Sequence, residues 1–509
     1  MHVLFFPVII TFICIVHAQC PDYADYSALH HAPFSDGRYN LSSQRPSPAC
    51  RTFNSTIVET TINATVADIA DPDLARLFLN SFPNTLDTAI KWKGYAANGS
   101  DEELTFVITG DINAMWLRDS ANQMQSYQQL LTASNSSDSL ASLYRGVINL
   151  QSRYILTSPY CNAFQPPAES GIDPVSSPIN GNIYPTYDNS SVFECKYELD
   201  SVAAFLEISS DYYTATQDLA FFGKYNWVET VEAILSLTDA MKTPTFAANG
   251  SVNPSPYSFQ KMTLRGSETL LNNGLGSPVN NNTGLIRSAF RPSDDSTIYQ
   301  FFIPANMMFS TYLSSAADIM RGLGNTDLAD SMSSLSSSLR TAIDDYGIVS
   351  SRINGDIYAY EVDGYGGANI MDDANIPSLL SAAFFGFVDV NDTVYQNTRK
   401  QVLSPQGNPY FNFGTVLSSV GGPHDGPGYA WPMASIVRIL TSSDDEEITD
   451  QLRQILSSTD GLGLIHESIN TFDQSDWTRQ WFSWANGLFG QMILDLKERK
   501  PHILQMGFQ

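Results

Sequence analysis

The stretch LADSMSSLSSSLRTAI, residues 328–343, carries apolar side chains at steps of four, three, four and four residues. Such spacing places one set of side chains on a single face of an α-helix, here Leu328, Met332, Leu335, Leu339 and Ile343. Similar stripes begin near residues 74, 140, 199, 227, 433, 448 and 481. The sequence therefore predicts an all-α protein.

Long connections rich in Gly, Pro, Asn and Ser separate the predicted helices, for example residues 276–296. Loops of this length inside a compact domain usually carry function. Recurring helices with such loops between them predict an α/α barrel whose long functional loops gather at one end. An irregular open solenoid is the alternative, because periodicity does not report closure.

The first eighteen residues, MHVLFFPVIITFICIVHA, are almost continuously apolar and precede the polar stretch QCPDYADYS. This pattern predicts a secretory signal peptide over residues 1–18, cut after Ala18, with a buried N-terminal helix as the alternative. Nine N-x-Ser/Thr sequons also favour a secreted glycoprotein. They begin at Asn40, Asn54, Asn63, Asn98, Asn135, Asn189, Asn249, Asn281 and Asn391.

Four cysteines follow the predicted cleavage site, an even number that suits two disulfides in an oxidising compartment. Three pairings satisfy this number. We favour Cys20 with Cys50 and Cys161 with Cys195, because neighbours in sequence close shorter loops.

The formal net charge of −26 makes attraction to nucleic acid or to an anionic membrane unfavourable. No apolar run after the signal peptide is long enough to span a bilayer. The chain has no P-loop, no G-x-S-x-G elbow, no HExxH helix and no CxxC pair, and only seven histidines. We therefore expect no metal, no cofactor, no nucleic acid and no membrane partner after signal cleavage.

Acidic residues instead gather with Trp, Tyr, Arg and Asn in the predicted loops. In GDINAMWLRDSANQM, residues 110–124, Asp111 and Asp119 flank Trp116 and Arg118. Sugars favour such company, because each hydroxyl both donates and accepts hydrogen bonds while an aromatic face covers the C–H side of the ring. Simpler roles compete: an Asp before a helix is usually an N-cap, and an Asp-Asp pair usually belongs to a turn. Clustering predicts a glycan-handling protein, either an enzyme or a lectin-like binder.

Seven ordered blocks resemble glycoside hydrolase family 125, the exo-acting α-1,6-mannosidases, between about residues 74 and 496. The blocks are GDINAMWLRDSANQM, CKYELDS, FRPSDDS, GGANIMDDANIPSLL, GPHDGPGYAWPM, GLIHESIN and WFSWANGLFG. The resemblance implies an (α/α)6 barrel and an inverting, metal-independent enzyme that releases terminal α-1,6-linked mannose from a mannose-containing oligosaccharide or glycan. It also implies one catalytic domain over residues 19–509, with an N-terminal extension to about residue 70.

The resemblance assigns roles to residues of these blocks. Asp200 would be the general acid and Glu467 the general base, with Trp116, Arg118 and Asp119 contacting the terminal sugar. Shared block membership adds the binding candidates Arg291, Asp294, Asp295, Asp372, Asn375 and His424.

Two features of the sequence disagree with the roles that the resemblance implies. Asp200 starts a predicted helix, whose N-terminus favours an ionised carboxylate, whereas a general acid needs a raised pKa. Arg287 stands where the family pattern has an aromatic residue, which affects the expected outer subsite. The alternatives are another inverting exo-glycosidase of glucoamylase type, or a glycan-binding glycoprotein without catalysis.

Overall fold

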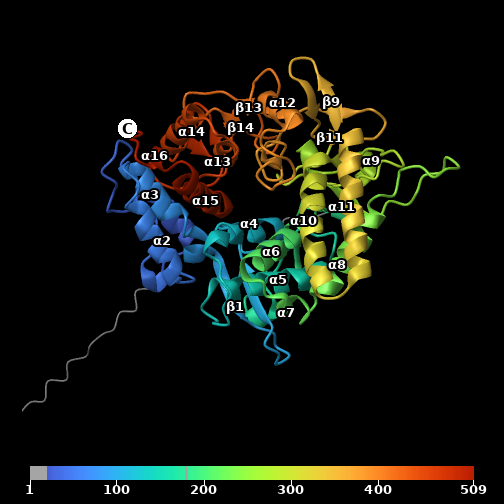
Figure 1. Cartoon of the computed structure of the whole chain (residues 1–509), viewed down its shortest axis with the longest axis horizontal. Coiled ribbons are helices and arrows are strands. Elements are labelled where there is room, and N and C mark those ends of the chain that lie inside the picture. The colour runs from blue at the N-terminus through green and yellow to red at the C-terminus, as the bar shows by residue number, and fades with distance from the viewer. Residues whose placement is uncertain (1–19, 178–180) are drawn as a thin grey trace, which may run out of the picture.

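The computed structural model describes residues 20–177 and 181–509 (Figure 1), so the predicted signal peptide lies outside the described residues. Six elements form an inner ring in which each contacts the next and the last packs against the first. They are α4 (Leu117–Gln125), α6 (Leu199–Thr216), α10 (Ile303–Gly322), the short 3-10 helix η6 (Leu380–Ala382), α13 (Pro432–Leu440) and α15 (Ser483–Arg499). Because the ring closes, the fold is an (α/α)6 barrel and not an open solenoid.

An outer layer of helices covers this ring, as Figure 1 shows. It consists of α5 (Leu140–Thr157), α8 (Trp227–Ala240), α11 (Thr326–Tyr346), α12 (Thr393–Val402), α14 (Asp445–Ser457) and α3 (Pro72–Ser81). Helix α3, from the N-terminal part, packs against α15 from the C-terminal part. The two ends of the chain therefore close the barrel together.

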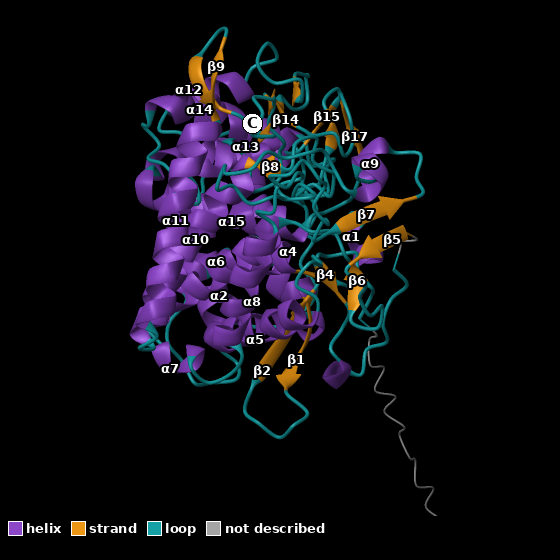
Figure 2. Ribbon diagram, turned by 90° about the vertical axis from the view of Figure 1, so that its right-hand side faces the viewer, coloured by secondary structure: helices purple, strands orange, loops and turns teal. Residues whose placement is uncertain are grey.

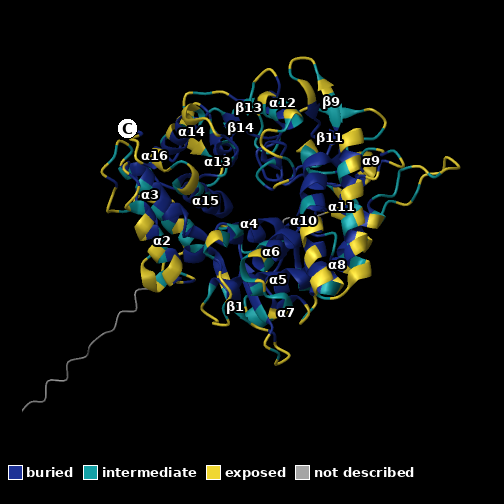
Figure 3. Cartoon of the chain, in the orientation of Figure 1, coloured by how far each residue is buried: buried dark blue, intermediate teal, exposed yellow. Residues whose placement is uncertain are grey.

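Burial follows the two layers. Inner helices such as α4 are buried on nearly every side, whereas outer helices expose one face to solvent (Figure 3). In α11 the predicted stripe supplies the inward face, with Met332, Leu339 and Ile343 fully buried. Burial of each such side chain contributes about 1.5–3 kcal/mol to the stability of the fold. The apolar stripe therefore marks the face that the helix buries, and for this reason it predicts the helix.

Short strands and the remaining helices order the connections, and Figure 2 shows loops and strands gathered on one side of the helical rings. All paired strands are antiparallel. The pairs and triplets are β1 (Ile90–Tyr95) with β2 (Glu103–Val107); β3 (Met115–Trp116), β4 (Ala163–Phe164) and β6 (Val192–Glu194); β5 (Gly181–Tyr184) with β7 (Ser258–Lys261); β8 (Phe301–Phe302), β11 (Glu361–Val362) and β12 (Ala368–Asn369); β9 (Ile348–Ser351) with β10 (Gly355–Tyr358); β13 (Phe411–Asn412) with β14 (Ser419–Val420); and β15 (Tyr429–Ala430), β16 (Ile469–Asn470) and β17 (Asp473–Trp477). Short helices outside the rings are α1 (Tyr23–Ser27), α2 (Thr56–Val66), α7 (Leu219–Phe222), α9 (Leu271–Gly274) and α16 (Pro501–Leu504).

Residues 20–70 pack along the barrel, with α2 against α3. Both predicted disulfides are present, Cys20–Cys50 in this segment and Cys161–Cys195 between the loops of β4 and β6. Within the described ranges, no helix has both the length and the apolar character that crossing a membrane requires.

Two carboxyl groups lie one turn apart on α6, Glu207 buried in the barrel core and Asp211 half-buried. Glu207 accepts hydrogen bonds from Asn122 (3.3 Å), Gln125 (3.0 Å) and the Tyr312 hydroxyl (2.7 Å). Burial raises the pKa of Glu207 to about 8, and burial likewise raises the pKa of Asp211 to about 7. The core therefore holds these groups in their protonated form at mildly acidic pH.

This pair makes stability depend on pH. Because the pKa of a Glu in the unfolded chain is about 4.3, the folded state binds more protons between that value and about 8, and stability falls as pH rises through this window. We expect the thermal unfolding midpoint to be higher at pH 5 than at pH 8, and E207Q to reduce the difference. The exposed Glu498 supplies the control, E498Q. An E207Q protein with the full wild-type difference would contradict the assignment.

Candidate active site

The amino-terminal ends of the inner ring meet at the loop end of the barrel and line one pocket. Segments directly before or at the start of α4, α10, η6, α13 and α15 supply its wall. Helix N-termini present free N–H groups and partial positive charge, so this end of the barrel suits carboxylates and sugar hydroxyls.

Seven of the residues predicted from the sequence line this pocket: Trp116, Arg118, Asp119, Asp294, Asn375, His424 and Glu467. Four others, Asp200, Arg291, Asp295 and Asp372, are buried behind the wall. Sequence reasoning missed the rest of the lining, namely Thr109, Ile112, Pro292, Ser293, Trp431, Arg479 and Phe482.

Arg118, at the start of α4, is the centre of a buried network. Its Nη1 donates to Glu198 Oε2 (2.6 Å) and to Asp200 Oδ2 (2.8 Å). Its Nη2 donates to the carbonyl of Pro292 (2.7 Å) and lies 3.6 Å from Asp119. Only 2% of the Arg118 side chain is exposed. The adjacent Arg-Asp pair is therefore not a surface ion pair: it ties α4, α6 and the loop before α10 together.

Asp200 lies beneath the pocket and not in its wall. Its side chain is fully enclosed in the first turn of α6, and one carboxylate oxygen is taken by Arg118. Burial raises the pKa of Asp200, although Arg118 and the helix N-terminus oppose this. The raised pKa resolves the expected conflict with the helix dipole, but the carboxyl group has no exposed surface and does not belong to the pocket lining.

Glu467 is held in one orientation at the opposite side of the pocket. Its Oε1 accepts a hydrogen bond from Arg479 Nη1 (3.0 Å), and its Oε2 accepts one from the Thr478 hydroxyl (3.1 Å). Arg479 also pairs with Asp111 and lies over the Phe482 ring, 5.5 Å from its centroid. This arrangement fixes the carboxyl group of Glu467 at the pocket wall, as a group that positions a water molecule requires.

Asp294 reaches the pocket from the loop before α10. Its backbone has a φ of 68°, a left-handed conformation that is costly for a residue with a side chain and is found most often at functional sites. Its Oδ1 lies 3.4 Å from Lys196 Nζ, and 29% of its side chain is exposed. Burial would raise the pKa of Asp294, but Lys196, Arg118 and His424 together lower it.

Two further ionisable groups shape the pocket. Burial raises the pKa of Asp119 to about 6, although Arg118 acts against this. Burial would lower the pKa of His424, but Asp295, 3.7 Å away, together with Asp294 and Asp425, raises it to about 10. The pocket therefore presents a protonated imidazole that can donate hydrogen bonds to a ligand.

The residues behind the wall hold its loops in place. Arg291 Nε donates to Glu361 (2.7 Å), and Asp372 accepts the backbone N–H groups of Leu379 (2.8 Å) and Leu380 (2.9 Å). Asn375 Nδ2 donates to the Pro292 carbonyl (2.7 Å), the same atom that Arg118 binds. Arg291 and Asp372 thus hold the loops by an ion pair and by a cap, and neither belongs to the pocket lining.

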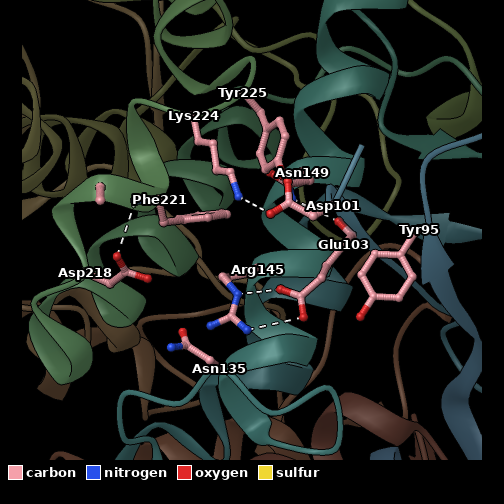
Figure 4. Close-up of a pocket in the computed structure, with 11 residues that line it drawn as sticks. Tyr95, Asp101, Glu103, Asn135, Arg145, Asn149, Asp218, Phe221, Lys224 and Tyr225 are labelled. Carbon is pink, nitrogen blue, oxygen red and sulfur yellow. Dashed lines mark hydrogen bonds and ion pairs between the residues drawn. The ribbon is translucent and has the colours of Figure 1, made fainter. Parts of the chain in front are cut away.

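A larger hollow of about 490 Å³ lies between the β1–β2 hairpin, α5 and α7 (Figure 4). It shares no lining residue with the loop pocket. Its charged side chains satisfy one another, since Arg145 pairs with Glu103 and Lys224 with Asp101. We therefore assign the chemistry to the loop pocket.

The fold and the acidic loop pocket define a class of protein, the glycoside hydrolases built on an (α/α)6 barrel. The chain belongs to the family of metal-independent α-mannosidases, glycoside hydrolase family 125, whose model matches residues 71–494. It is a glycoside hydrolase that acts on mannose-containing glycans.

Two relatives extend over most of the chain. The meiotically up-regulated gene 157 protein of Schizosaccharomyces pombe is 47% identical over 487 residues, which cover 96% of this chain and 94% of that protein. A solved structure of a metal-independent α-mannosidase from Streptococcus pneumoniae, a non-productive complex with α-1,6-mannobiose, is 31% identical with a TM-score of 0.76. The match covers 88% of this chain and 100% of that one.

Removal of the central guanidinium tests the buried network. R118M leaves Glu198 and Asp200 enclosed without a cation, so we expect the free energy of unfolding at pH 7 to fall by about 3–5 kcal/mol in urea titrations. R453M is the matched control, because Arg453 is 48% exposed and pairs only with the exposed Asp450. Such a surface pair contributes less than about 1 kcal/mol. Equal losses in the two variants would refute a central role for Arg118.

Proposed function

We propose that the protein is an inverting exo-α-1,6-mannosidase that releases one terminal mannose at a time. The observation that carries this proposal is that two carboxyl groups, Asp294 and Glu467, line one pocket together with Arg118 and Asp119. A pocket receives the end of a glycan, whereas cleavage within a chain needs an open cleft. The α-1,6 linkage is supported by the mannobiose bound to the Streptococcus pneumoniae relative.

Glu467 is the proposed general base. Arg479 and Thr478 occupy its oxygens on the protein side and hold it at the pocket wall. In an inverting reaction the base removes a proton from water as that water attacks the anomeric carbon. The C–O bond to the leaving sugar breaks in the same step.

For the general acid we propose Asp294 in place of Asp200. An acid must reach the glycosidic oxygen, and in an exo-enzyme this oxygen lies toward the mouth of the pocket. Asp294 has 29% of its side chain exposed, Asp119 has 8%, and Asp200 has none. These exposures support Asp294 as the residue nearest the leaving group and Asp119 as the residue nearer the bound end of the sugar.

The surroundings of Asp294 bear on how it is protonated. Lys196, Arg118 and His424 lower the pKa of Asp294 and so favour its ionised form. A bound sugar excludes water, which disfavours the charge and raises the pKa of a carboxyl group. An acid with a lowered pKa also transfers its proton more readily, although it holds that proton in a smaller fraction of molecules.

The remaining lining residues are proposed to bind the terminal mannose. The Asp119 carboxylate accepts hydrogen bonds from sugar hydroxyls. Asn375 and the protonated His424 donate hydrogen bonds to sugar oxygens, and Trp116 covers the C–H face of the ring. Arg118 acts mainly by holding Asp119 and the Pro292 carbonyl in position.

We also propose that the protein is a secreted glycoprotein, one catalytic domain with an N-terminal extension to about residue 70. All nine sequon asparagines are exposed. The two disulfides favour an oxidising compartment. These features support export, with the predicted signal peptide as its means.

Two variants distinguish the acid from its alternative. General acid catalysis contributes roughly 10²- to 10⁴-fold, so we expect D294N to lower kcat/KM on α-1,6-mannobiose by a factor in this range. α-Mannosyl fluoride needs no protonation to leave, and D294N should hydrolyse it far better than mannobiose relative to the wild type. D200N, checked for folding by circular dichroism, should lack this selective recovery. Recovery in D200N but not in D294N would return the role to Asp200.

Glu467 has a separate signature. E467Q should lose hydrolysis of both α-mannosyl fluoride and mannobiose, because the attacking water lacks its base whichever group leaves. Binding of mannose, followed by calorimetry, should persist. Near-normal turnover by E467Q would exclude Glu467 as the base and favour a different pair.

The released sugar tests linkage and stereochemistry together. Incubated with α-1,2-, α-1,3- and α-1,6-mannobiose and with maltose, the protein should cleave the α-1,6 isomer fastest, and proton NMR should detect β-mannose first. Preference for maltose would indicate a glucoamylase-type enzyme. No cleavage of any disaccharide would favour a glycan binder, and α-mannose as the first product would contradict inversion.

A further inference from the structure

Arg287 differs from the other buried arginines of the molecule. Its residue is 4% exposed, yet no Asp or Glu oxygen within the described residues lies close enough to form an ion pair with it. Arg118 and Arg291 are similarly buried and each has a carboxylate partner, at 2.6 and 2.7 Å. A buried charge without a counter-charge is costly, so the position calls for a compensating group.

The protein itself compensates Arg287 only in part. Its Nε donates to the Met241 carbonyl (3.2 Å), and its backbone N–H donates to the same oxygen (3.3 Å). Met241 caps the C-terminal end of α8, where the helix carries a partial negative charge. Burial lowers the pKa of Arg287 to about 10, so the guanidinium is still a cation at neutral pH.

The guanidinium lines a pocket of about 200 Å³ that is separate from the loop pocket. Its wall is largely apolar and includes no Asp or Glu among the described residues; it contains Pro244, Val252, Pro254, Leu275 and Pro278. Within the same part of the chain, neither Nη group of Arg287 donates to a protein atom. The two Nη groups of Arg287 are therefore hydrogen-bond donors without a protein acceptor among the described residues.

Other polar side chains of the wall are already occupied. The Asn253 amide donates to the Pro244 carbonyl (2.9 Å), and the Asn272 amide donates to the Gly276 carbonyl (3.0 Å). The Ser255 hydroxyl donates to the Tyr257 carbonyl (2.6 Å). Arg287 is thus the charged donor that this pocket offers to a ligand.

We propose that this pocket is a binding site for a small oxyanion, a phosphate or carboxylate group, with Arg287 as its charged ligand. The planar fork of a guanidinium matches the spacing of two oxygens in such groups. An apolar wall excludes water and strengthens the attraction. The proposal does not depend on the function proposed above, because no catalytic candidate lines this pocket.

The site is connected to the loop pocket through one short segment. Ser288 Oγ accepts the backbone N–H of Leu199 at the start of α6 (3.0 Å). The backbone N–H groups of Ala289 and Phe290 donate to the Tyr197 carbonyl, at 3.1 and 3.0 Å. The same segment continues to Asp294. An anion bound by Arg287 would therefore lie at the start of the chain segment that leads to Asp294, the proposed acid.

Titration with inorganic phosphate tests the site on the full-length protein. Calorimetry at pH 7 and constant ionic strength should detect one saturable site, with a Kd on the order of 1 mM, and phosphate should raise the thermal unfolding midpoint. R287Q should weaken binding at least about tenfold, the effect expected when a charge-assisted contact is lost. R340Q is the matched control, because Arg340 is half-buried, donates to the Phe387 carbonyl (2.9 Å) and lies outside this pocket.

Parallel titrations with acetate and with mannose 6-phosphate distinguish the source of the anion. Tighter binding of the sugar phosphate to the wild type that R287Q removes would assign the site to an anion carried on a glycan, and equal or weaker binding to a free anion. R287M should unfold at the wild-type temperature or higher in phosphate-free buffer, because it removes an uncompensated charge. The absence of saturable anion binding by the wild type, or equal affinity in R287Q, would overturn the proposal.

Discussion

The buried guanidinium of Arg118 stabilises the cluster of carboxyl groups at the loop end of this barrel. Carboxyl groups accumulate there because helix N-termini converge, and each would be costly in a site shielded from water. Arg118 binds Glu198 and Asp200 and also holds the Pro292 carbonyl, so a single cation offsets charge and fixes the loop that carries Asp294. Loss of this contact would affect α4, α6 and the pocket wall at once.

The same interaction divides the acids into two groups. Asp200 and Glu198 lie below the guanidinium and are fully enclosed, whereas Asp119, Asp294 and Glu467 face the pocket. Second cations then act on the pocket side: Arg479 holds Glu467, and Lys196 lies beside Asp294. These acids occur in similar motifs of the sequence. In the structure they nevertheless differ in exposure, in counter-charge and in the direction of their pKa shifts.

Periodicity and motif spacing predict much of this structure, for definite physical reasons. The stripe in residues 328–343 predicts α11, because burial of one face is local information. The disulfide pairing follows from loop length, whereas Trp116, Arg118, Asp119 and Glu467 come from the family resemblance, in blocks that lie before or at the start of inner helices. Closure of the ring is not local, since it depends on α15 meeting α4 from the other end of the chain.

The features of the site that the sequence does not reveal have the same origin. Asp200 stands in the first turn of a helix as expected, but sequence does not reveal that its side chain turns beneath Arg118. The sequence does not predict a role for Arg479 either, because it is a single arginine in a loop. Its role at the site depends on its ion pairs with Asp111 and Glu467, which the sequence alone does not reveal. The resemblance supplied Asp294 as a binding candidate, and its exposure and strained backbone give it a larger proposed role.

A crystal structure with a sulfur-linked α-1,6-mannobiose, which the protein cannot cleave, tests the central claim most directly. The account predicts the terminal mannose in the loop pocket, with Asp119 on its hydroxyls and Asp294 beside the bridging sulfur. Glu467 should hold a water molecule below the anomeric carbon, with the two carboxyl groups about 6.5–9.5 Å apart. A ligand bound elsewhere, or a bridging atom contacted by Asp200, would contradict it.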